Sequence, residues 1–321
     1  MHRIKSPIFI FSLPRSGSTL LQRILMTHSE IASVAEPWIL LPLIYAEKKS
    51  GLFSEYNQDW SSTAIEDFIG HLPEGKAGYQ QELRKFILTL YSKHCSNGES
   101  YFLDKTPRYY LIIKEIVELF PQAKFIFLFR NPVEILSSIL TSWCNKSLFK
   151  VHVYQNDLFN GPVLLAEGYR LHRHLAYRVD YKSLLEDPQR EIEGICQYLE
   201  VPFEEAMLQK FPESILKGQM GDSIGTKTYS TISTNTLFKW NQAIDTWVLK
   251  KYFLHYINSL DKKVLEEFGY SKEALIQGLT QLSIGKVGHW KEWMYWLRGK
   301  IIVRFKLNLL LMRRKLKVYY S

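Results

Sequence analysis

The apolar positions of the first 180 residues alternate between strand-like runs and helix-like spacing. Residues 8–13 (IFIFSL) and 124–129 (KFIFLF) are almost wholly apolar and mix β-branched with aromatic residues, as buried strands do. Residues 101–104 (YFLD) have the pattern of a strand end, and a fourth strand is expected near Leu175. Helical spacing follows the first run over residues 19–28. This alternation predicts a three-layer α/β fold with a central, mainly parallel sheet.

The first strand ends in a short polar loop, residues 14–18 (PRSGS), after which helical spacing begins at once. Gly17 lets the backbone bend tightly. The unpaired amides of residues 16–20 would then converge at a helix N-terminus, where the helix dipole adds partial positive charge. The pattern therefore predicts an anion-binding loop.

The loop lacks the residues that typically bind a nucleoside triphosphate. In the pattern GxxxxGK[ST], the first glycine would fall at Ser12 and the lysine at Ser18. Arg15 instead supplies positive charge from inside the loop. A P-loop kinase is an alternative, but it should carry this lysine and an acid that binds magnesium.

The segment PRSGSTL resembles the 5′-phosphosulfate loop of sulfotransferases that use 3′-phosphoadenosine 5′-phosphosulfate (PAPS), especially the tyrosylprotein and carbohydrate branches. The resemblance covers roughly residues 7–240. It implies a fold of the P-loop-kinase type with a helical C-terminal region. It also implies an enzyme that transfers the sulfuryl group of PAPS to a hydroxyl and releases 3′,5′-ADP. The loop residues implied to bind the donor are Arg15, Ser16, Gly17, Ser18, Thr19 and Leu20.

A second block resembles the 3′-phosphate motif of the same family. The strand 124–129 runs directly into Arg130, and Ser138 follows on the next predicted helix. A guanidinium and a hydroxyl placed in this way can hold a phosphate dianion. Asn131 stands where the family commonly has an acid. Tyr181 matches the family's tyrosine that contacts the nucleotide or its 3′-phosphate, and the alternative is a buried tyrosine bonded to backbone.

Glu36 stands in an apolar setting twenty-one residues after Arg15, a distance that fits one helix and a return strand to the same sheet edge. In the tyrosylprotein sulfotransferases, which this chain resembles, a glutamate at this distance is the catalytic base. Lys105 lies on a strand-to-helix turn at the same edge. The resemblance implies that Glu36 accepts the hydroxyl proton, while Arg15, Lys105 and the loop amides stabilise the developing charge without a metal ion. His28 and His94 are the next candidates for the base.

Residues 217–240 are rich in Gly, Ser and Thr and are expected to form a long ordered loop. In the family such a loop closes over the cofactor, so Lys217 and Lys227 are candidates for a contact with the 3′-phosphate. The tyrosylprotein branch has a serine two residues before the tryptophan, where this chain has Phe238. Thr236 is the hydroxyl that could replace it.

Length and composition favour one domain over residues 1–285, because no repeat and no linker rich in Pro, Gly or Ser divides it. Cys95, Cys144 and Cys196 are widely spaced and odd in number, which favours a reducing compartment over a disulfide framework. The loop lies so close to Met1 that no signal peptide or N-terminal anchor is expected. These features predict a cytoplasmic, bacterial enzyme.

The basic charge is concentrated in residues 286–321. This tail holds ten Lys or Arg residues and one acid, a net charge of +9 that equals the formal net charge of the whole chain. Trp290, Trp293, Trp296 and Leu297 recur at helical spacing, which suits an interfacial helix on the anionic inner face of a membrane. The alternative is a helix packed on the core with a solvated basic face. Nucleic acid is not an expected partner, because the charge lies at one end and follows no known binding module.

The acceptor is weakly constrained, because residues 41–100, which help form the acceptor pocket in the family, carry no motif. A glycan hydroxyl is the preferred acceptor. A lipid-linked sugar or a small alcohol comes next, and protein tyrosine last, because no basic groove for acidic peptides can be located. A non-catalytic peripheral membrane protein would explain the tail, but it would leave Arg15, Glu36, Lys105 and Arg130 without a common purpose.

Overall fold

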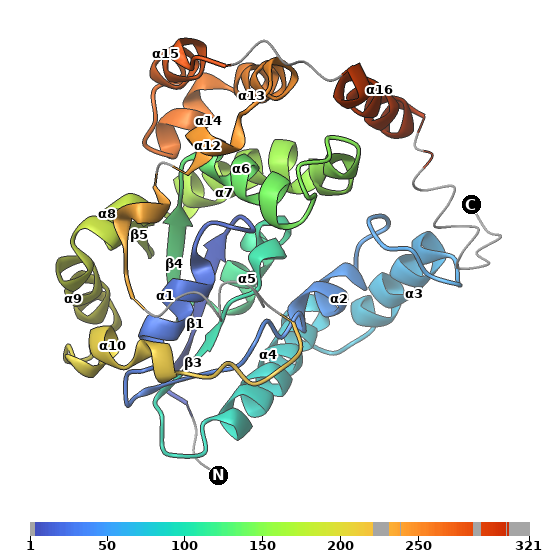
Figure 1. Cartoon of the computed structure of the whole chain (residues 1–321). Coiled ribbons are helices and arrows are strands. Elements are labelled where there is room, and N and C mark those ends of the chain that lie inside the picture. The colour runs from blue at the N-terminus through green and yellow to red at the C-terminus, as the bar shows by residue number, and fades with distance from the viewer. Residues whose placement is uncertain (1–3, 221–230, 238, 285–289, 306, 308–321) are drawn as a thin grey trace.

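Five strands form one parallel sheet at the centre of the molecule (Figure 1). The computed structural model describes residues 4–220, 231–237, 239–284, 290–305 and 307. Within them the strand order is β2-β3-β1-β4-β5, and every neighbouring pair is parallel. The strands are β1 (Ser6–Ser12), β2 (Ile31–Ser33), β3 (Tyr101–Asp104), β4 (Lys124–Phe129) and β5 (Ala176–Asp180).

Helices connect these strands and follow the last of them, so the predicted α/β fold with a parallel sheet and a helical C-terminal region is confirmed. The α-helices of the first half are α1 (Ser18–Leu25), α2 (Leu40–Tyr45), α3 (Gln58–Gly70), α4 (Gly75–His94), α5 (Ile113–Leu119) and α6 (Pro132–Ser142). Those that follow are α7 (Gly161–His172), α8 (Tyr181–Glu186), α9 (Pro188–Leu199), α10 (Ala206–Gln209), α12 (Trp240–Ala243), α13 (Trp247–Ser259), α14 (Lys262–Glu267), α15 (Lys272–Gln281) and α16 (Trp290–Arg304). Short helical turns are η1 (Pro107–Leu111), η2 (Lys150–Tyr154), η3 (Asn156–Asn160), η4 (Phe211–Glu213) and η5 (Thr234–Thr236).

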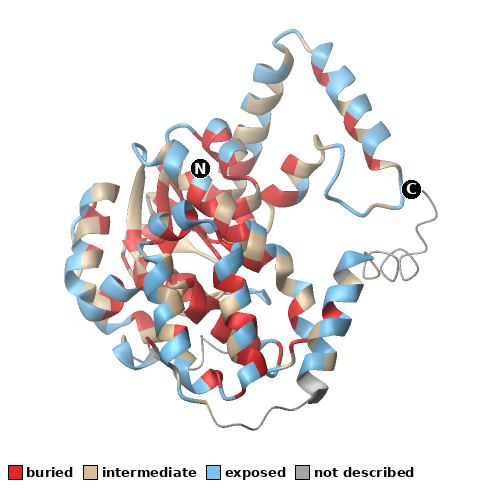
Figure 2. Ribbon diagram, turned by 90° about the horizontal axis from the view of Figure 1, so that it is seen from above, coloured by how far each residue is buried: buried red, intermediate tan, exposed pale blue. Residues whose placement is uncertain are grey.

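The two faces of the sheet bury different side chains, because successive strand residues point to opposite sides. On β1, Phe9 and Phe11 join a cluster with helices α5, α6 and α7. Ile8 and Ile10 join a second cluster with α1, α8 and α9. Figure 2 shows buried residues gathered around the strands and exposed residues on the outer helix surfaces. The sheet is therefore the middle of three layers.

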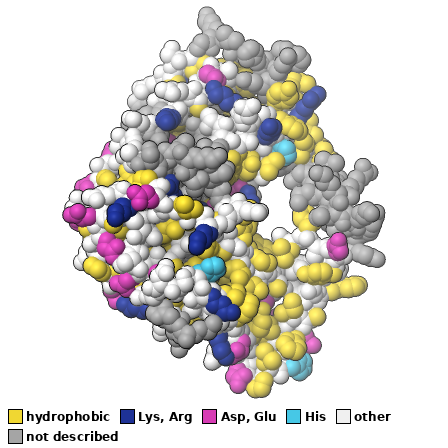
Figure 3. Space-filling view, turned by 60° about the horizontal axis from the view of Figure 1, so that its bottom comes forward, with side chains coloured by type: hydrophobic (Ala, Val, Ile, Leu, Met, Phe, Trp, Pro, Cys, Tyr) yellow, Lys and Arg dark blue, Asp and Glu magenta, His cyan; other side chains and the backbone are white. Residues whose placement is uncertain are grey.

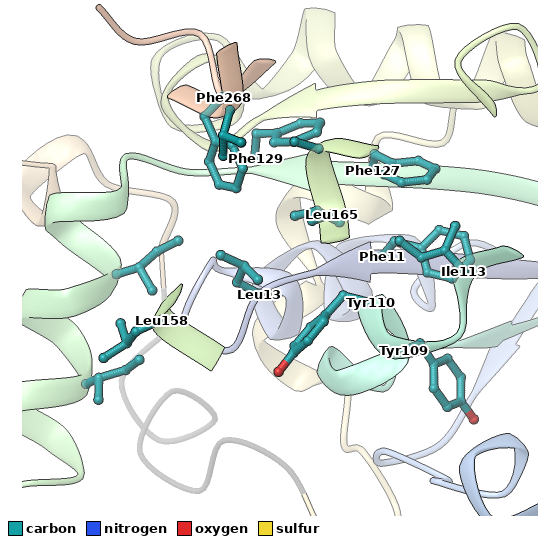
Figure 4. Close-up of a cluster of buried hydrophobic side chains, with 14 of the residues drawn as sticks. Phe11, Leu13, Tyr109, Tyr110, Ile113, Phe127, Phe129, Leu158, Leu165 and Phe268 are labelled. Carbon is teal, nitrogen blue, oxygen red and sulfur yellow. The ribbon is translucent and has the colours of Figure 1, made fainter. Parts of the chain in front are cut away.

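The C-terminal helices α13, α14 and α15 extend the phenylalanine-rich side of the core. The ring of Phe268, just after α14, lies 5.0 Å from the ring of Phe129 at the end of β4. Figure 4 shows this pair in one cluster with Phe127, Leu165 and Leu13. Helices α13 and α14 also contact α6 and α7. These helices thus share the core of the sheet and support the elements that follow β4.

The carboxyl ends of β1, β3 and β4 meet at one edge of the sheet. From β1 the chain moves to β2 and β3 on one side, and β4 then joins the other side of β1. An open parallel sheet has a crevice at the strand ends where the direction of the connections reverses. The loop 14–18, Lys105 and Arg130 directly follow these three strands. The topology therefore brings them to the same crevice.

The aromatic residues of helix α16 lie partly against the core and partly at the surface. The ring of Trp296 lies edge-on to that of Tyr252, with centroids 6.1 Å apart. Trp293 and Leu297 are 47% and 41% exposed. Trp296 therefore packs on the core, as one alternative for the tail predicted, whereas the membrane-interface alternative stays a prediction. The side chain of Trp290 lies outside the described residues. None of the described helices is both long and apolar enough to cross a membrane.

Candidate active site

The loop between β1 and α1 passes twice through the left-handed region of backbone conformation. Arg15 has φ = 67°, and Gly17, the N-cap of α1, has φ = 90°. A Cβ atom at position 17 would lie 2.2 Å from Cε2 of Tyr181. Glycine is therefore required here both by conformation and by space, because the Tyr181 ring lies directly against the loop.

The amides available to an anion are fewer than the sequence predicted. The N–H of Ser16 donates to the carbonyl of Leu13, and the N–H of Leu20 donates to the carbonyl of Gly17. In the described part of the chain no backbone acceptor is bonded to the amides of Gly17, Ser18 and Thr19. Three consecutive donors thus remain at the N-terminus of α1. The hydroxyl of Ser16 is also buried without a hydrogen-bond partner among the described residues, which fits a polar ligand at this loop.

A cavity of about 240 Å³ opens in front of the loop. Several predicted residues line it, namely Arg15, Gly17, Ser18, Thr19, Glu36 and Arg130. The other lining residues are Pro14, Trp38, Pro107, Arg108, Trp143, Tyr154 and Met220. One cavity therefore brings together residues from four strand ends and from the segments after α6 and α10.

Glu36 and Lys105 form one ion pair beside the loop. The Nζ of Lys105 donates to Oε1 of Glu36 at 2.8 Å and to Oγ1 of Thr19 at 3.3 Å. The Glu36 side chain is only 10% exposed, and the Lys105 side chain is only 1% exposed. The indole Nε1 of Trp38 donates to Oε2 of Glu36 at 3.1 Å. Each carboxylate oxygen thus has one protein donor and keeps a second acceptor position for a ligand.

Arg130 and Ser138 meet through Arg15 in the described structure. The Nε of Arg130 donates to Oε2 of Glu134 at 2.8 Å, and its Nη1 donates to the carbonyl of Arg15 at 3.0 Å. The Nε of Arg15 donates to Oγ of Ser138 at 3.0 Å. The Arg130 guanidinium also lies 4.3 Å from the ring centre of Tyr181. Burial raises the pKa of the Glu134 carboxyl, and the adjacent Arg130 opposes that shift.

The segment after α10 reaches the cavity by its first residues. The carbonyl of Lys217 accepts a hydrogen bond of 2.9 Å from the N–H of Ala35, next to the proposed base. Thr236 lies in η5 and does not line the cavity. Lys227 and Phe238 lie outside the described residues.

Three further candidates lie away from the cavity. The side chain of Leu20 is buried in the second core cluster, so it supports the loop from behind. The Nε2 of His28 lies 2.8 Å from the carbonyl of Pro202, and the ring of His94 lies 5.6 Å from that of Phe102. Neither histidine is among the described residues that line the cavity.

Arg108 lines the cavity, although no sequence motif marks it. Its Nε and Nη2 donate to Oδ1 and Oδ2 of Asp157 at 3.0 and 2.9 Å, and the Tyr110 hydroxyl donates to Oδ1 at 2.8 Å. The Arg108 guanidinium lies 5.6 Å from the ring centre of Trp38. Its position three residues after Lys105, on the same turn, was the signal that could have identified it. Trp143 and Tyr154 follow α6 without any motif.

Behind the ion pair, β3 ends in a buried carboxylate. Asp104 accepts hydrogen bonds from Tyr91 at 2.6 Å, Tyr109 at 2.9 Å and Thr106 at 3.2 Å. Burial raises the pKa of Asp104 to about 6, although the three hydroxyl donors and Lys105 oppose that shift. The ionised form therefore carries a free-energy cost in the folded state.

Because of this cost, the difference in the free energy of unfolding between the wild type and Asp104→Asn should depend on pH. Below about pH 4 the carboxyl is protonated in both the folded and unfolded states. Between pH 4 and 6 the unfolded chain ionises first, so the Asp104 contribution to stability falls by about 3 kcal/mol and stays constant above that range. Urea unfolding of both proteins from pH 4 to 7 should show this loss in the wild type relative to the variant. If the two proteins differ in unfolding free energy by the same amount at every pH in this range, the folded-state pKa of Asp104 is not raised.

Comparison with known proteins gives matches to sulfotransferases. Residues 7–205 match the model of the sulfotransferase family. The nodulation protein NoeE of Sinorhizobium fredii is 31% identical over 225 residues, which cover 61% of this chain and 51% of NoeE. Protein-tyrosine sulfotransferase 1 of Danio rerio is 25% identical over 247 residues, which cover 73% of this chain and 65% of that protein.

The chain spans about half the length of NoeE and somewhat less than two thirds of the tyrosine sulfotransferase. A solved structure, the sulfotransferase domain from the Synechococcus PCC 7002 olefin synthase, aligns with a TM-score of 0.47 at 24% identity. The alignment covers 74% of this chain and 88% of that domain.

Proposed function

This chain belongs to the sulfotransferase family, and we propose that it transfers the sulfuryl group of PAPS to a hydroxyl of a neutral glycan, with Glu36 as the base. The family assignment makes the chain an enzyme of sulfuryl transfer. The observation that carries the finer proposal is the cavity that holds the free loop amides, Arg15 and the Glu36–Lys105 pair together. The loop also has serine where a triphosphate-binding loop has lysine, which favours PAPS over ATP.

The loop has the donor set that the 5′-phosphosulfate part of PAPS needs. The amides of Gly17, Ser18 and Thr19 are free of backbone acceptors, and the helix dipole favours an anion there. Arg15 lines the same cavity. For the 3′-phosphate we propose Arg130, because no hydrogen bond in the described part of the chain uses its Nη2, and Ser138, which Arg15 holds nearby.

PAPS supplies the sulfuryl group, and its 3′,5′-ADP part departs as the acceptor oxygen attacks sulfur in line. Glu36 takes the proton of the acceptor hydroxyl at a carboxylate oxygen. Lys105 and Arg15 place positive charge beside the loop, where negative charge grows during the reaction. The low exposure of Glu36 and Lys105 strengthens these electrostatic interactions relative to those in water.

The remaining walls of the cavity favour a neutral, amphipathic acceptor. Trp143 and Tyr154 lie with ring centres 4.9 Å apart, and Trp38 lies against Arg108. The positive charge of Arg108 is balanced by the Asp157 carboxylate, to which it donates two hydrogen bonds. Arg108 therefore offers little attraction to an acidic peptide. A sugar ring presents hydroxyls at its edge and C–H groups on its faces, which suits aromatic walls with few polar groups.

Transfer of ³⁵S from PAPS tests this acceptor class. The panel should contain a neutral oligosaccharide, a lipid-linked sugar, an alkyl alcohol and an acidic tyrosine peptide. We expect label on the oligosaccharide or on the lipid-linked sugar. Label on the tyrosine peptide alone would contradict the glycan proposal. If none of the four compounds is labelled, the acceptor belongs to none of these classes and the glycan proposal is wrong.

We also propose that α16 attaches the enzyme to an anionic membrane surface. Trp293, Leu297, Ile301 and Phe305 are exposed and recur at every fourth residue, so they form an apolar stripe along the helix. Basic residues of the same tail surround this stripe in the sequence. Figure 3 shows that hydrophobic side chains also reach the surface on other parts of the molecule. A helix of this kind binds an interface by apolar burial and by attraction to anionic lipid.

The variant Trp293→Glu/Leu297→Glu should reduce cosedimentation with anionic liposomes by at least about tenfold, because each buried apolar side chain contributes roughly 1.5 to 3 kcal/mol. Trp60→Glu/Phe68→Glu is the matched control, because it changes two exposed aromatic residues on α3, outside the basic tail. High salt should weaken the wild-type binding. Equal binding by wild type and the α16 variant would exclude this helix as the attachment site.

A further inference from the structure

We propose that Trp38 is a positioning residue for the base: its indole N–H fixes the Glu36 carboxylate, and Thr106 holds the backbone of Trp38 in the conformation that this requires. The proposal rests on the proposed function, because it matters for catalysis only if Glu36 is the base. It adds a second support to the carboxylate besides the ion pair with Lys105.

The backbone of Trp38 is in a conformation that bulky residues rarely adopt. Its φ is 57°, in the left-handed region, although tryptophan has the largest side chain of the standard amino acids. Such a conformation persists only where surrounding contacts determine it, and it occurs preferentially at functional sites. The strain at Trp38 therefore calls for a local structure that holds it.

A short chain of hydrogen bonds provides this support. The N–H of Trp38 donates to Oγ1 of Thr106 at 3.3 Å, and the hydroxyl of Thr106 donates to Oδ1 of Asp104 at 3.2 Å. Thr106 and Asp104 are both completely buried at the end of β3. The end of the central sheet thus fixes the backbone position from which the indole reaches Glu36.

The same carboxylate anchors the next part of this segment. Oδ2 of Asp104 accepts from the hydroxyls of Tyr91 and Tyr109. The Tyr109 hydroxyl in turn accepts from the N–H of Leu40 at 3.4 Å. Both Trp38 and Leu40 are therefore tied to one buried acid, which limits rotation of the backbone between them.

The result is a carboxylate held on two sides. Lys105, on the turn after β3, bonds to Oε1 of Glu36, and the indole of Trp38 bonds to Oε2. Arg108 also lies next to Trp38: its guanidinium is 5.6 Å from the ring centre of the indole and is paired with Asp157. A fixed carboxylate needs less reorganisation to meet the acceptor hydroxyl.

Trp38→Phe tests the role of the indole N–H, because it keeps an aromatic ring against Arg108 and removes the donor. We expect kcat to fall by about 10- to 100-fold, the usual size for a lost hydrogen bond to a charged group. The KM for PAPS should stay close to the wild-type value, because the proposed donor contacts are made by the loop amides and Arg130. Binding of 3′,5′-ADP should not change.

Thr106→Val and Thr106→Ser form a matched pair that does not alter the cavity wall. The valine variant removes the hydroxyl that holds the Trp38 N–H, so it should lower kcat without raising the KM for PAPS, while serine should restore the wild-type kcat. A loss of folding alone would lower the melting temperature of the valine variant while leaving kcat per folded molecule at the wild-type value. That result would overturn the proposal.

Glu36→Gln, measured alongside, separates two kinds of failure. Near-wild-type turnover of that variant would overturn Glu36 as the base and hence the proposed function. A large loss of kcat in Glu36→Gln together with an unchanged kcat in Trp38→Phe would overturn the positioning role alone.

Discussion

Replacing Glu36 by glutamine should lower kcat for sulfuryl transfer by about 10² to 10⁴ while leaving the affinity for 3′,5′-ADP nearly unchanged. The amide oxygen can still accept a hydrogen bond from Lys105, but the side chain can no longer take a proton from the acceptor. The amide nitrogen would also face the indole N–H of Trp38, so one hydrogen bond is lost. Steady-state kinetics with PAPS and calorimetric titration with 3′,5′-ADP check the two parts of this expectation.

The variant Glu36→Asp serves as a control for the charge of Lys105. It keeps a carboxylate near that buried lysine but withdraws it by one methylene, so its melting temperature should exceed that of Glu36→Gln. Both variants should be slow, because neither places a carboxylate at the acceptor oxygen. If Glu36→Gln turns over at close to the wild-type rate, the base must be another residue.

The second large effect should appear in nucleotide recognition. We expect 3′,5′-ADP to bind about 10² to 10⁴ times more tightly than 5′-AMP, because two charge-assisted hydrogen bonds to the 3′-phosphate contribute roughly 1.5 to 3 kcal/mol each. Arg130 is the proposed source of these bonds, with Ser138 nearby through Arg15. Isothermal titration of the same protein with both nucleotides measures the difference directly.

Two variants show whether Arg130 is responsible for this discrimination. Arg130→Met should bring the two dissociation constants to within about tenfold of each other, because it removes the guanidinium. Lys182→Met is the matched control, since Lys182 is an exposed cation next to Tyr181 and pairs with Glu186 at the surface. Equal discrimination in wild type and Arg130→Met would move the 3′-phosphate site elsewhere.

Most of the fold could be predicted from the sequence because its strands are nearly continuous apolar runs. The run at residues 124–129 coincides with β4, and the YFLD segment coincides with β3. Buried parallel strands give such runs because both faces are covered. Strand β2 has three residues, and its pattern was too short to define its ends.

The residues that follow strands were also predictable, since parallel topology brings the strand ends to one edge. Arg15, Glu36 and Arg130 indeed line one cavity, and Lys105 bonds to Glu36. The motif pattern could not show which amides of the loop stay free. That depends on local bonds such as the one from Leu20 to Gly17, which belong to the exact turn geometry.

The walls of the cavity were beyond the sequence for a different reason. Trp143 and Tyr154 come from the irregular segment after α6, where no periodicity fixes the direction of a side chain. The strained backbone of Trp38 depends on Thr106, sixty-eight residues away in the chain. Contacts between residues so far apart in the chain are set by tertiary packing, so local sequence propensity cannot predict them.

A crystal structure of the protein with 3′,5′-ADP would show directly whether this cavity is the donor site. We expect the 5′-phosphate at the amides of Gly17, Ser18 and Thr19, and the 3′-phosphate at Arg130. The cavity beside Glu36 and Lys105 should remain open for the acceptor. A nucleotide bound with its 3′-phosphate at the loop, or bound outside this cavity, would contradict it.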